Sequence, residues 1–182
     1  MTKNINMLNN DFLFIGSYSL LHKGLDLYVD AARKFPNYNF RVLARTSEES
    51  HFVNKLDLPQ NVILDGFYPT DSPEFLYILK KCRYVVLPSI SEGMATSVLT
   101  GIIGGKLLPI ITKECGIDMT DNVVPVAEHT VESLEKSISC ALQMSKIQIK
   151  NSVEALSVYY RERCSIEYFQ AQIRTNLERI AS

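Results

Sequence analysis

The chain has 182 residues, of which 46% are hydrophobic and 21% are charged, a balance typical of a folded globular domain and not of a disordered chain. Its formal net charge is −1 and no basic run is longer than Lys80-Lys81, so nucleic acid is not an expected partner. The longest apolar runs, such as 84–88, are far shorter than the ~20 residues that span a bilayer, and the N-terminus does not resemble a signal peptide. The sequence therefore predicts a cytoplasmic protein without a transmembrane segment.

Short β-rich runs alternate along the chain with longer amphipathic stretches. The predicted strands cover 12–15, 39–43, 62–64, 84–87, 107–112 and 123–126. The predicted helices cover 24–34, 47–56, 72–81, about 95–104, 131–143, 149–160 and 166–180. The strands are apolar on both faces, as in a parallel sheet that helices cover on each side. We therefore expect an α/β fold, a Rossmann-like doubly wound parallel sheet of about six strands with helices on both faces.

Ligands of doubly wound folds bind beyond the carboxyl ends of the strands. Four loops at predicted strand ends carry glycine or polar residues and are candidate ligand contacts: 16–24, 44–47, 66–71 and 89–97.

The four cysteines are far apart and none forms a C-x-x-C pair or has a histidine at ligand spacing. They are Cys82, Cys115, Cys140 and Cys164. We expect reduced and mostly buried thiols, with neither zinc nor a disulfide. The three histidines, interpreted as surface or capping residues, are His22, His51 and His129.

The loop 89–97 lies between a buried strand and the predicted start of a helix. Unpaired N–H groups of a first helical turn and the helix dipole attract anions such as a diphosphate. Thr96 and Ser97 add hydroxyl donors, and Gly93 lets the backbone approach a ligand without a Cβ. The alternative is that Ser91 and Glu92 only cap the helix.

The loop 16–24 carries a lysine, Lys23, just before the next predicted helix. Its ammonium group could reach a phosphate placed over the sheet. A lysine at a helix start is, taken alone, more often a solvated surface residue.

These two loops resemble the donor site of the retaining glycosyltransferases of the GT-B fold (family 4, glycosyl transferases group 1). The first loop matches the pattern G-[RS]-x5-K-G. The second matches the family's P-S pair followed by E-G. The family has a second glutamate eight positions after the first, and Thr100 stands there in this chain.

The resemblance implies a role for each matching residue. Glu92 would accept hydrogen bonds from hydroxyls of the donor sugar, while Ser17 and Lys23 would lie beside the diphosphate. Gly66-Phe67 would offer backbone groups to the base. The residues expected to act in catalysis are Glu92 and Lys23. The residues expected to bind the donor are Gly16, Ser17, Lys23, Gly66, Phe67, Glu92, Gly93, Met94, Ala95, Thr96, Ser97 and Thr100.

Thr100 replaces the glutamate that in the family holds the ribose. A threonine gives one hydrogen bond where a carboxylate clamps two, so nucleotide affinity should fall by ~1–2 kcal/mol. A subgroup that reads S-E-G-x-x-x-S-V-L-T shares this departure, with a P-I-I-T strand and an E-x-G-I-D loop. This chain has both, at Pro109–Thr112 and Glu114–Asp118.

The resemblance covers about residues 12 to 182 and therefore one half of a GT-B enzyme. It implies a single C-terminal nucleotide-sugar-binding domain over 1–182, with a leader at 1–11 and a helical tail at 145–182. The N-terminal acceptor domain would be absent, and the polar start favours a domain excised from a longer chain.

The implied activity is that of a hexosyltransferase of polysaccharide biosynthesis. It would transfer a sugar, with retention, from a nucleotide-diphosphate donor to a glycan or glycolipid acceptor, without a cofactor or metal. This part alone is expected to be inactive, and a peripheral position at the inner face of the membrane stays open. One alternative is a degenerate, non-catalytic half-transferase that acts as a binding or assembly module. Another is a sugar-nucleotide 2-epimerase, which would need a set of carboxylates and histidines that the sequence does not offer.

Overall fold

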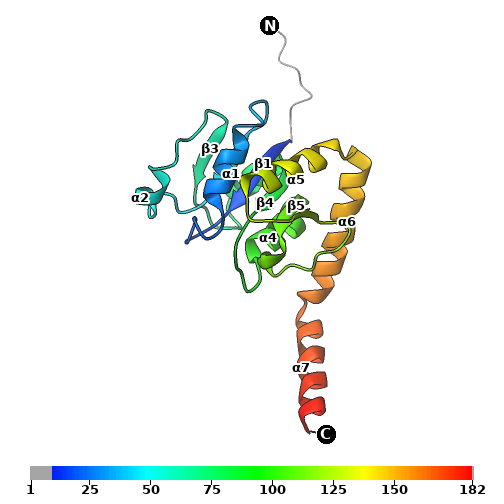
Figure 1. The fold of residues 1–182 in the computed structure, drawn as a ribbon. Helices are drawn as coiled ribbons and strands as arrows, with labels where there is room; N and C mark the ends of the chain where they lie inside the picture. Colours follow the sequence, from blue (N-terminus) through cyan, green and yellow to red (C-terminus); the bar gives the residue numbers. More distant parts are fainter. Residues whose placement is uncertain (1–9, 182) are drawn as a thin grey trace.

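The computed structural model describes residues 10–181 and contains one parallel six-stranded sheet with the strand order β3-β2-β1-β4-β5-β6 (Figure 1). The strands are β1 (Asp11–Ile15), β2 (Phe40–Leu43), β3 (Val62–Gly66), β4 (Cys82–Leu87), β5 (Leu108–Thr112) and β6 (Val124–Val126). The helices are α1 (Leu25–Ala32), α2 (Ser50–Val53), α3 (Pro73–Lys81), α4 (Thr96–Gly105), α5 (Val131–Gln143), α6 (Lys146–Arg163) and α7 (Ile166–Ala181), with a short 3₁₀ turn at Lys113–Cys115. Most of the predicted leader, residues 1–9, lies outside the described residues.

The strand order confirms the predicted doubly wound α/β fold. The chain builds outward from β1 to β3 and then returns to place β4 on the other side of β1. Right-handed crossovers that run in opposite directions leave helices on opposite faces. In agreement, α1 contacts α5, while α4 contacts α3 and α6. The topological switch point lies between β1 and β4, where ligands of such folds bind.

Two predicted helices differ from the observed ones. The helix predicted over 47–56 is the single turn α2, because only Val53 of this segment is buried and little apolar surface stabilises a longer helix. The helix predicted over 149–160 is α6, which begins at Lys146. Its start is fixed by a capping box in which Ser145 and Gln148 bond each other's backbone N–H groups.

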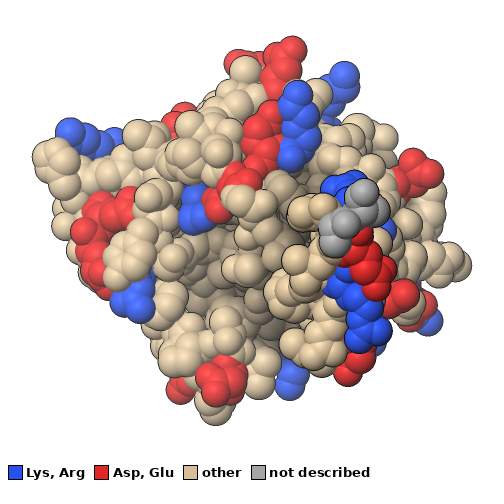
Figure 2. Space-filling model, turned by 90° about the horizontal axis from the view of Figure 1, so that it is seen from below, with Lys and Arg blue, Asp and Glu red and all other residues tan. Residues whose placement is uncertain are grey.

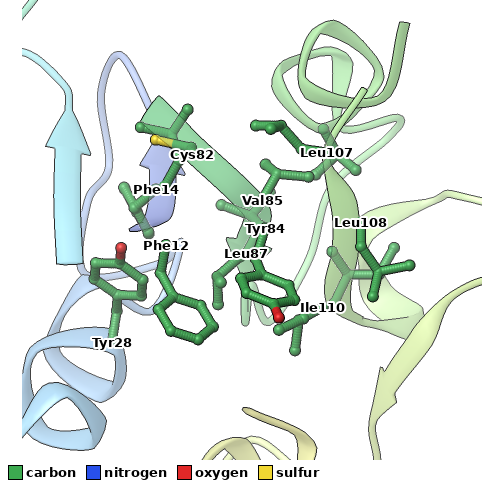
Figure 3. Packing of buried hydrophobic residues seen from close by; sticks show 14 of the residues in the cluster. Phe12, Phe14, Tyr28, Cys82, Tyr84, Val85, Leu87, Leu107, Leu108 and Ile110 are labelled. Carbon is green, nitrogen blue, oxygen red and sulfur yellow. The ribbon is translucent and has the colours of Figure 1, made fainter. Parts of the chain in front are cut away.

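The core contains several aromatic rings beside aliphatic side chains, and Figure 3 labels Phe12, Tyr28 and Tyr84 among them. Phe12 of β1 stacks on Phe40 of β2, with ring centroids 4.7 Å apart, and on Tyr84 of β4, 4.6 Å apart. These three residues are register partners in the parallel ladders. Because such large rings are buried on both sides of β1, the registers of its two neighbours are strongly specified.

Helix α4 lies close to the sheet because it carries glycine where it crosses β4. A Cβ on Gly101 would come within 2.9 Å of the Val85 side chain, a separation that packed cores do not allow. This contact fixes the position of the whole helix, including the N-terminus that faces the switch point.

Helix α7 projects away from the rest of the domain (Figure 1). Its exposed apolar side chains are Ile166, Phe169, Ile173, Leu177 and Ile180. Among residues 10–181, no helix is both long and apolar enough to cross a membrane.

The four cysteines are free, and only half of them are buried. Cys82 and Cys115 lie in the core, whereas Cys140 and Cys164 are exposed. The expectation of mostly buried thiols is therefore wrong for these two, which lie on solvent-facing positions of helix α5 and at the end of α6.

Candidate functional site

The loops that follow β1 and β4 meet at the switch point and are joined through their backbones. The N–H of Ile90 donates to the carbonyl oxygen of His22 at 3.1 Å. Gly24, with φ of 78°, lies so close to the other loop that a Cβ would come within 2.4 Å of the Pro88 carbonyl oxygen. Only glycine combines this backbone conformation with this approach, so the two loops are held in one arrangement.

An ion pair between Lys23 and Glu92 lies at this junction. The Nζ atom of Lys23 donates to Oε1 of Glu92, and the two side chains are only 17% and 16% exposed. Ser89, which is fully buried, donates its hydroxyl to the same carboxylate oxygen at 3.2 Å. The residue that caps α4 is Ala95, without a side-chain hydrogen bond, so the alternative of Ser91 and Glu92 as helix caps is wrong.

The ion pair borders a cavity of about 200 Å³, named here the switch-point cavity. Its lining residues are Ile15, Gly16, Ser17, Lys23, Phe67, Thr70, Glu92, Met94, Ala95, Thr96, Ser97 and Thr100. Figure 2, which views the molecule from below, shows a hollowed and largely uncharged surface with charged side chains mostly around it. Side chains from three strand-end loops and the start of α4 thus converge on one space.

Ten of the twelve residues predicted to bind a donor line this cavity, and Gly66 and Gly93 do not. A Cβ at either of these two glycines would meet no atom within 4 Å. Two lining residues were not among the predicted ones. Thr70 belongs to a loop that the sequence marked as a candidate, and Ile15 is the last residue of β1, next to Gly16.

The start of α4 offers fewer free backbone amides than the sequence suggests. The N–H of Ala95 donates to the carbonyl of Cys115 at 2.9 Å, and that of Thr96 donates to Met94 at 2.8 Å. Among the described residues, no acceptor is bonded to the amides of Met94 and Ser97. The predicted anion contacts at 94–97 therefore narrow to two amides and the hydroxyls of Thr96 and Ser97.

Thr100 lines the cavity one turn into α4. Its hydroxyl donates to the Thr96 carbonyl oxygen at 2.9 Å. The proton of this hydroxyl is thus used within the helix, and Thr100 offers a ligand only an acceptor oxygen.

A stacked cation lies beside the cavity, at the ends of β2 and β3. The Arg45 guanidinium lies 3.9 Å from the ring centroid of Phe67 and 5.4 Å from that of Tyr18. Arg45 also pairs with Glu48 at 2.8 Å, and this hydrogen bond lowers the pKa of the Glu48 carboxyl. Arg45 follows the end of a predicted strand, where a phosphate or acceptor contact and a surface charge are both possible, and the structure places its guanidinium over two aromatic rings.

A second hollow of about 320 Å³ continues the switch-point cavity toward β2 and β3. It shares Ile15, Phe67 and Thr70 with that cavity. The two spaces together follow the carboxyl edge of the sheet over β1, β2 and β3.

Buried polar groups behind the site, which no sequence pattern indicates, hold the end of β4. Thr112 donates its hydroxyl to the Ser89 carbonyl at 2.5 Å, and the Cys115 thiol donates to Leu87 at 3.1 Å. Burial raises the pKa of the Cys115 thiol, which keeps it protonated and able to donate. The patterns at Pro109–Thr112 and Glu114–Asp118 contain Thr112 and Cys115 but do not indicate these bonds.

His22 is a further missed residue. Its Nε2 atom lies 2.6 Å from the carbonyl oxygen of Ser91, so it joins the two loops by its side chain as well as its backbone. Within residues 10–181, no group of three or more histidine, cysteine, aspartate or glutamate side chains could hold a metal ion.

Comparisons with known proteins connect this site to one fold. No family model and no curated protein matches the sequence. Among solved structures, a glycosyltransferase from Rickettsia africae superposes with a TM-score of 0.72 at 19% identity, over 93% of this chain and 47% of its own. HepE of Anabaena, in complex with UDP and glucose, superposes with a TM-score of 0.72 at 15% identity, over 96% of this chain and 50% of its own.

The structure of trehalose-6-phosphate from E. coli bound with UDP-2-fluoro glucose superposes with a TM-score of 0.70 at 11% identity, over 93% of this chain and 44% of its own. The chain thus spans about half the length of these proteins. As the resemblance implied, it has the fold of one half of a GT-B glycosyltransferase.

Proposed function

We propose that this domain binds a nucleotide-diphosphate sugar in the switch-point cavity and forms the donor half of a retaining glycosyltransferase. The observation that carries the proposal is the Lys23–Glu92 ion pair. It places one cation and one anion, from loops 69 residues apart, at the wall of a cavity at the topological switch point.

The diphosphate is assigned to Lys23 and the start of α4. Lys23 and Ser97 both line the cavity, no acceptor is bonded to the Ser97 amide among the described residues, and the helix dipole adds roughly half a positive charge. A diphosphate carries more negative charge than the Glu92 carboxylate, so it competes well for the ammonium group. Binding then exchanges an internal partner of Lys23 for the ligand.

The sugar is assigned to Glu92. Once Lys23 turns to the diphosphate, the carboxylate is free to accept hydrogen bonds from sugar hydroxyls. Ser89 still holds one of its oxygens at 3.2 Å and thereby keeps its orientation. Such charge-assisted hydrogen bonds are short and strong.

The nucleoside is assigned to the hollow over β2 and β3. Small-molecule sites usually measure ~300–1,000 Å³, and the switch-point cavity alone, at about 200 Å³, is smaller. The adjoining hollow of about 320 Å³ supplies the remaining space. The aromatic side chains of Phe67, Tyr68 and Phe75 line this hollow and suit contact with a planar base.

The same groups account for catalysis of sugar transfer. Negative charge develops on the diphosphate as it leaves the sugar, and Lys23 with the start of α4 stabilises this charge. Holding the donor and the acceptor in fixed positions lowers the entropic cost of the reaction and accounts for the remaining rate acceleration. The acceptor, a glycan or glycolipid, would bind mainly to the other half of the enzyme.

The comparisons support this proposal through the ligands that two solved structures of the same fold contain, UDP with glucose and UDP-2-fluoro glucose. A third is named WaaG, a glycosyltransferase involved in lipopolysaccharide biosynthesis, which fits a role in polysaccharide biosynthesis.

The test is a calorimetric titration of the domain with UDP, UDP-glucose, GDP and GDP-mannose. Binding of at least one pair is expected, and Lys23→Ala should weaken it by at least about tenfold because the cation at the diphosphate is lost. Lys136→Ala is the matched control, since Lys136 is an exposed lysine of α5. Unchanged affinity in Lys23→Ala would refute the assignment.

The second candidate is a non-catalytic half-transferase that binds or assembles with other proteins. It is favoured by Thr100, whose hydroxyl proton is used within α4 and whose side chain cannot clamp a ribose as a carboxylate would. Absence of binding for all four ligands would favour this second candidate.

A further inference from the structure

A separate cavity, of about 340 Å³, lies at the opposite end of the sheet from the switch-point cavity and from the hollow next to it. We name it the basic cavity, and its lining residues are Cys82, Arg83, Lys106, Lys146, Ile149, Lys150, Val153 and Glu154. Cys82 and Arg83 begin β4, whose other end leads to the switch point. At ~3.3 Å per strand residue the two cavities are about 17 Å apart, so a ligand in one does not reach the other.

Positive charge is concentrated in the basic cavity although the whole chain has a formal net charge of −1. Four of its lining residues are cations, from β4, the end of α4 and the first turns of α6, and Glu154 is the one acidic lining residue. Glu154 pairs with Lys150 at 3.8 Å. Within residues 10–181, no carboxylate lies within 4.0 Å of the charged groups of Arg83, Lys106 or Lys146. Three like charges thus line one space without an ion-pair partner among the described residues, and the one carboxylate of the lining, Glu154, is paired with Lys150.

Two of these cations occupy positions that oppose local backbone preferences. Lys106 ends α4 with φ of 53° and ψ of 44°, a left-handed conformation in which glycine or asparagine is favoured. Lys146 is the first residue of α6, where the helix dipole disfavours a positive charge. Residues that break local rules are expected where function requires them, and both of these border the same cavity.

We propose that the basic cavity is a second anion-binding site that takes a phosphate-bearing ligand. Arg83 provides a planar fork that can hold two phosphate oxygens. Lys106, Lys146 and Lys150 supply further cations around it, and Ile149 and Val153 form an apolar wall that suits the organic part of such a ligand. The cavity is larger than inorganic phosphate needs, so a phosphomonoester or the headgroup of an anionic phospholipid fits the chemistry.

The site is tested by nitrogen-15 NMR of the whole domain titrated with inorganic pyrophosphate at low salt. Shifts are expected for amides of 82–83, 106 and 146–150, separately from any shifts at 23 and 92–97 that report on the donor site. Arg83→Gln and Lys146→Gln should each lower the pyrophosphate affinity obtained from the first set of shifts by about fivefold. The affinity obtained from the second set should stay unchanged. Lys136→Gln, on α5, is the matched control and should change neither.

Lys106→Gly separates a binding role from a structural one. It relieves the left-handed strain, so the thermal midpoint should rise, while the affinity for pyrophosphate should fall by a similar fivefold factor. A fall in stability with unchanged affinity would overturn the proposal. So would an absence of shifts around the basic cavity, or shifts that persist in the Arg83→Gln, Lys146→Gln double variant.

The source of the phosphate is distinguished by sedimentation with vesicles. Vesicles of phosphatidylglycerol and phosphatidylcholine should carry the domain down if the ligand is a lipid headgroup, and the double variant should stay in solution. Binding of glycerol 3-phosphate without sedimentation would identify a free phosphomonoester. If the vesicles do not carry the domain down, glycerol 3-phosphate does not bind, and pyrophosphate causes no shifts around the basic cavity, the proposed site is overturned.

Discussion

Two groups of ion pairs in this molecule have similar burial but different surroundings. Arg41 of β2 pairs with Asp11 at 2.8 Å and with Asp65 at 2.7 Å, and the three side chains are 11–14% exposed. Lys23 and Glu92 are 16–17% exposed. The first group lies among the strands of the sheet, where Asn39 also donates to Asp11. In the second group both partners line the switch-point cavity, whereas in the first group Asp11 lines a different hollow, of about 230 Å³, beside Asn39.

The difference teaches that burial alone does not separate a structural ion pair from a binding one. Burial by itself would lower the pKa of Arg41, but the hydrogen bonds and negative charges of Asp11 and Asp65 leave the pKa raised, because they stabilise the charged guanidinium. Lys23 lines the switch-point cavity, and in the proposed function a ligand in this cavity replaces Glu92 as its partner. Loss of Arg41 should therefore reduce stability, and loss of Lys23 should reduce binding.

The largest expected effect is on Arg41. Arg41→Ala leaves two carboxylates without a counter-charge and should lower the free energy of unfolding by about 3–5 kcal/mol. Urea denaturation followed by circular dichroism measures this loss. Lys23→Ala, the partner in the comparison, should leave the urea midpoint close to wild type. Equal losses of unfolding free energy in Arg41→Ala and Lys23→Ala would contradict the distinction between a structural and a binding ion pair.

Gly24→Ala should come next, because it disturbs the junction that holds the binding pair. The added Cβ would lie 2.4 Å from the Pro88 carbonyl oxygen, in a backbone with φ of 78°, and should cost about 2–3 kcal/mol of stability. Gly66→Ala is the matched control, since φ is 85° there and nothing lies within 4 Å. A control that loses as much would show that strain alone, and not the contact between loops, is responsible.

Thr100→Glu tests the second half of the site. If the ribose lies at Thr100, the new carboxylate should tighten binding of the free nucleotide by ~1–2 kcal/mol, about tenfold. Thr100→Gln, of the same shape without charge, should gain much less. Calorimetry measures both, and weaker binding in Thr100→Glu would show that the ribose contact lies elsewhere and that the added charge is poorly solvated.

The smallest expected effect lies outside both groups, at Tyr160 of α6. Burial, with the nearby Asp118 carboxylate, raises its pKa to about 12. The folded state therefore holds this proton more tightly than the unfolded state, whose tyrosines titrate near 10. Its contribution to stability is complete below pH 10 and is lost as pH rises toward 12. The free energy of unfolding of Tyr160→Phe, measured by urea denaturation, should fall less steeply between pH 10 and 12 than that of the wild type. Identical slopes for the two proteins would contradict the raised pKa of Tyr160.

The fold could be predicted well because its signals are local. Continuous apolar runs such as 84–87 predict buried parallel strands, and the observed β4 differs from that run only by two residues at its start. The length of α2 was predicted wrongly because it depends on how many of its side chains pack against the core. Only Val53 does so, and the sequence alone does not show this.

The site could be predicted as a set of residues but not as an arrangement. The motifs indicated Lys23 and Glu92 separately, and the resemblance gave them different ligand groups. Their ion pair depends on the approach of Gly24 to Pro88, a contact between loops that no local pattern specifies. The bonds of the Ala95 and Thr96 amides were missed for the same reason, since one acceptor, Cys115, follows a different strand.

The most direct test of the exchange between Glu92 and a ligand is calorimetry of Glu92→Ala with a free nucleotide and with its nucleotide sugar, using UDP and UDP-glucose and, as a second pair, GDP and GDP-mannose. Removal of the carboxylate releases Lys23, so the free nucleotide should bind as tightly as to the wild type or more tightly. The nucleotide sugar should lose about tenfold in affinity, because the charge-assisted bonds to its hydroxyls are gone. Equal losses for both ligands would contradict the account.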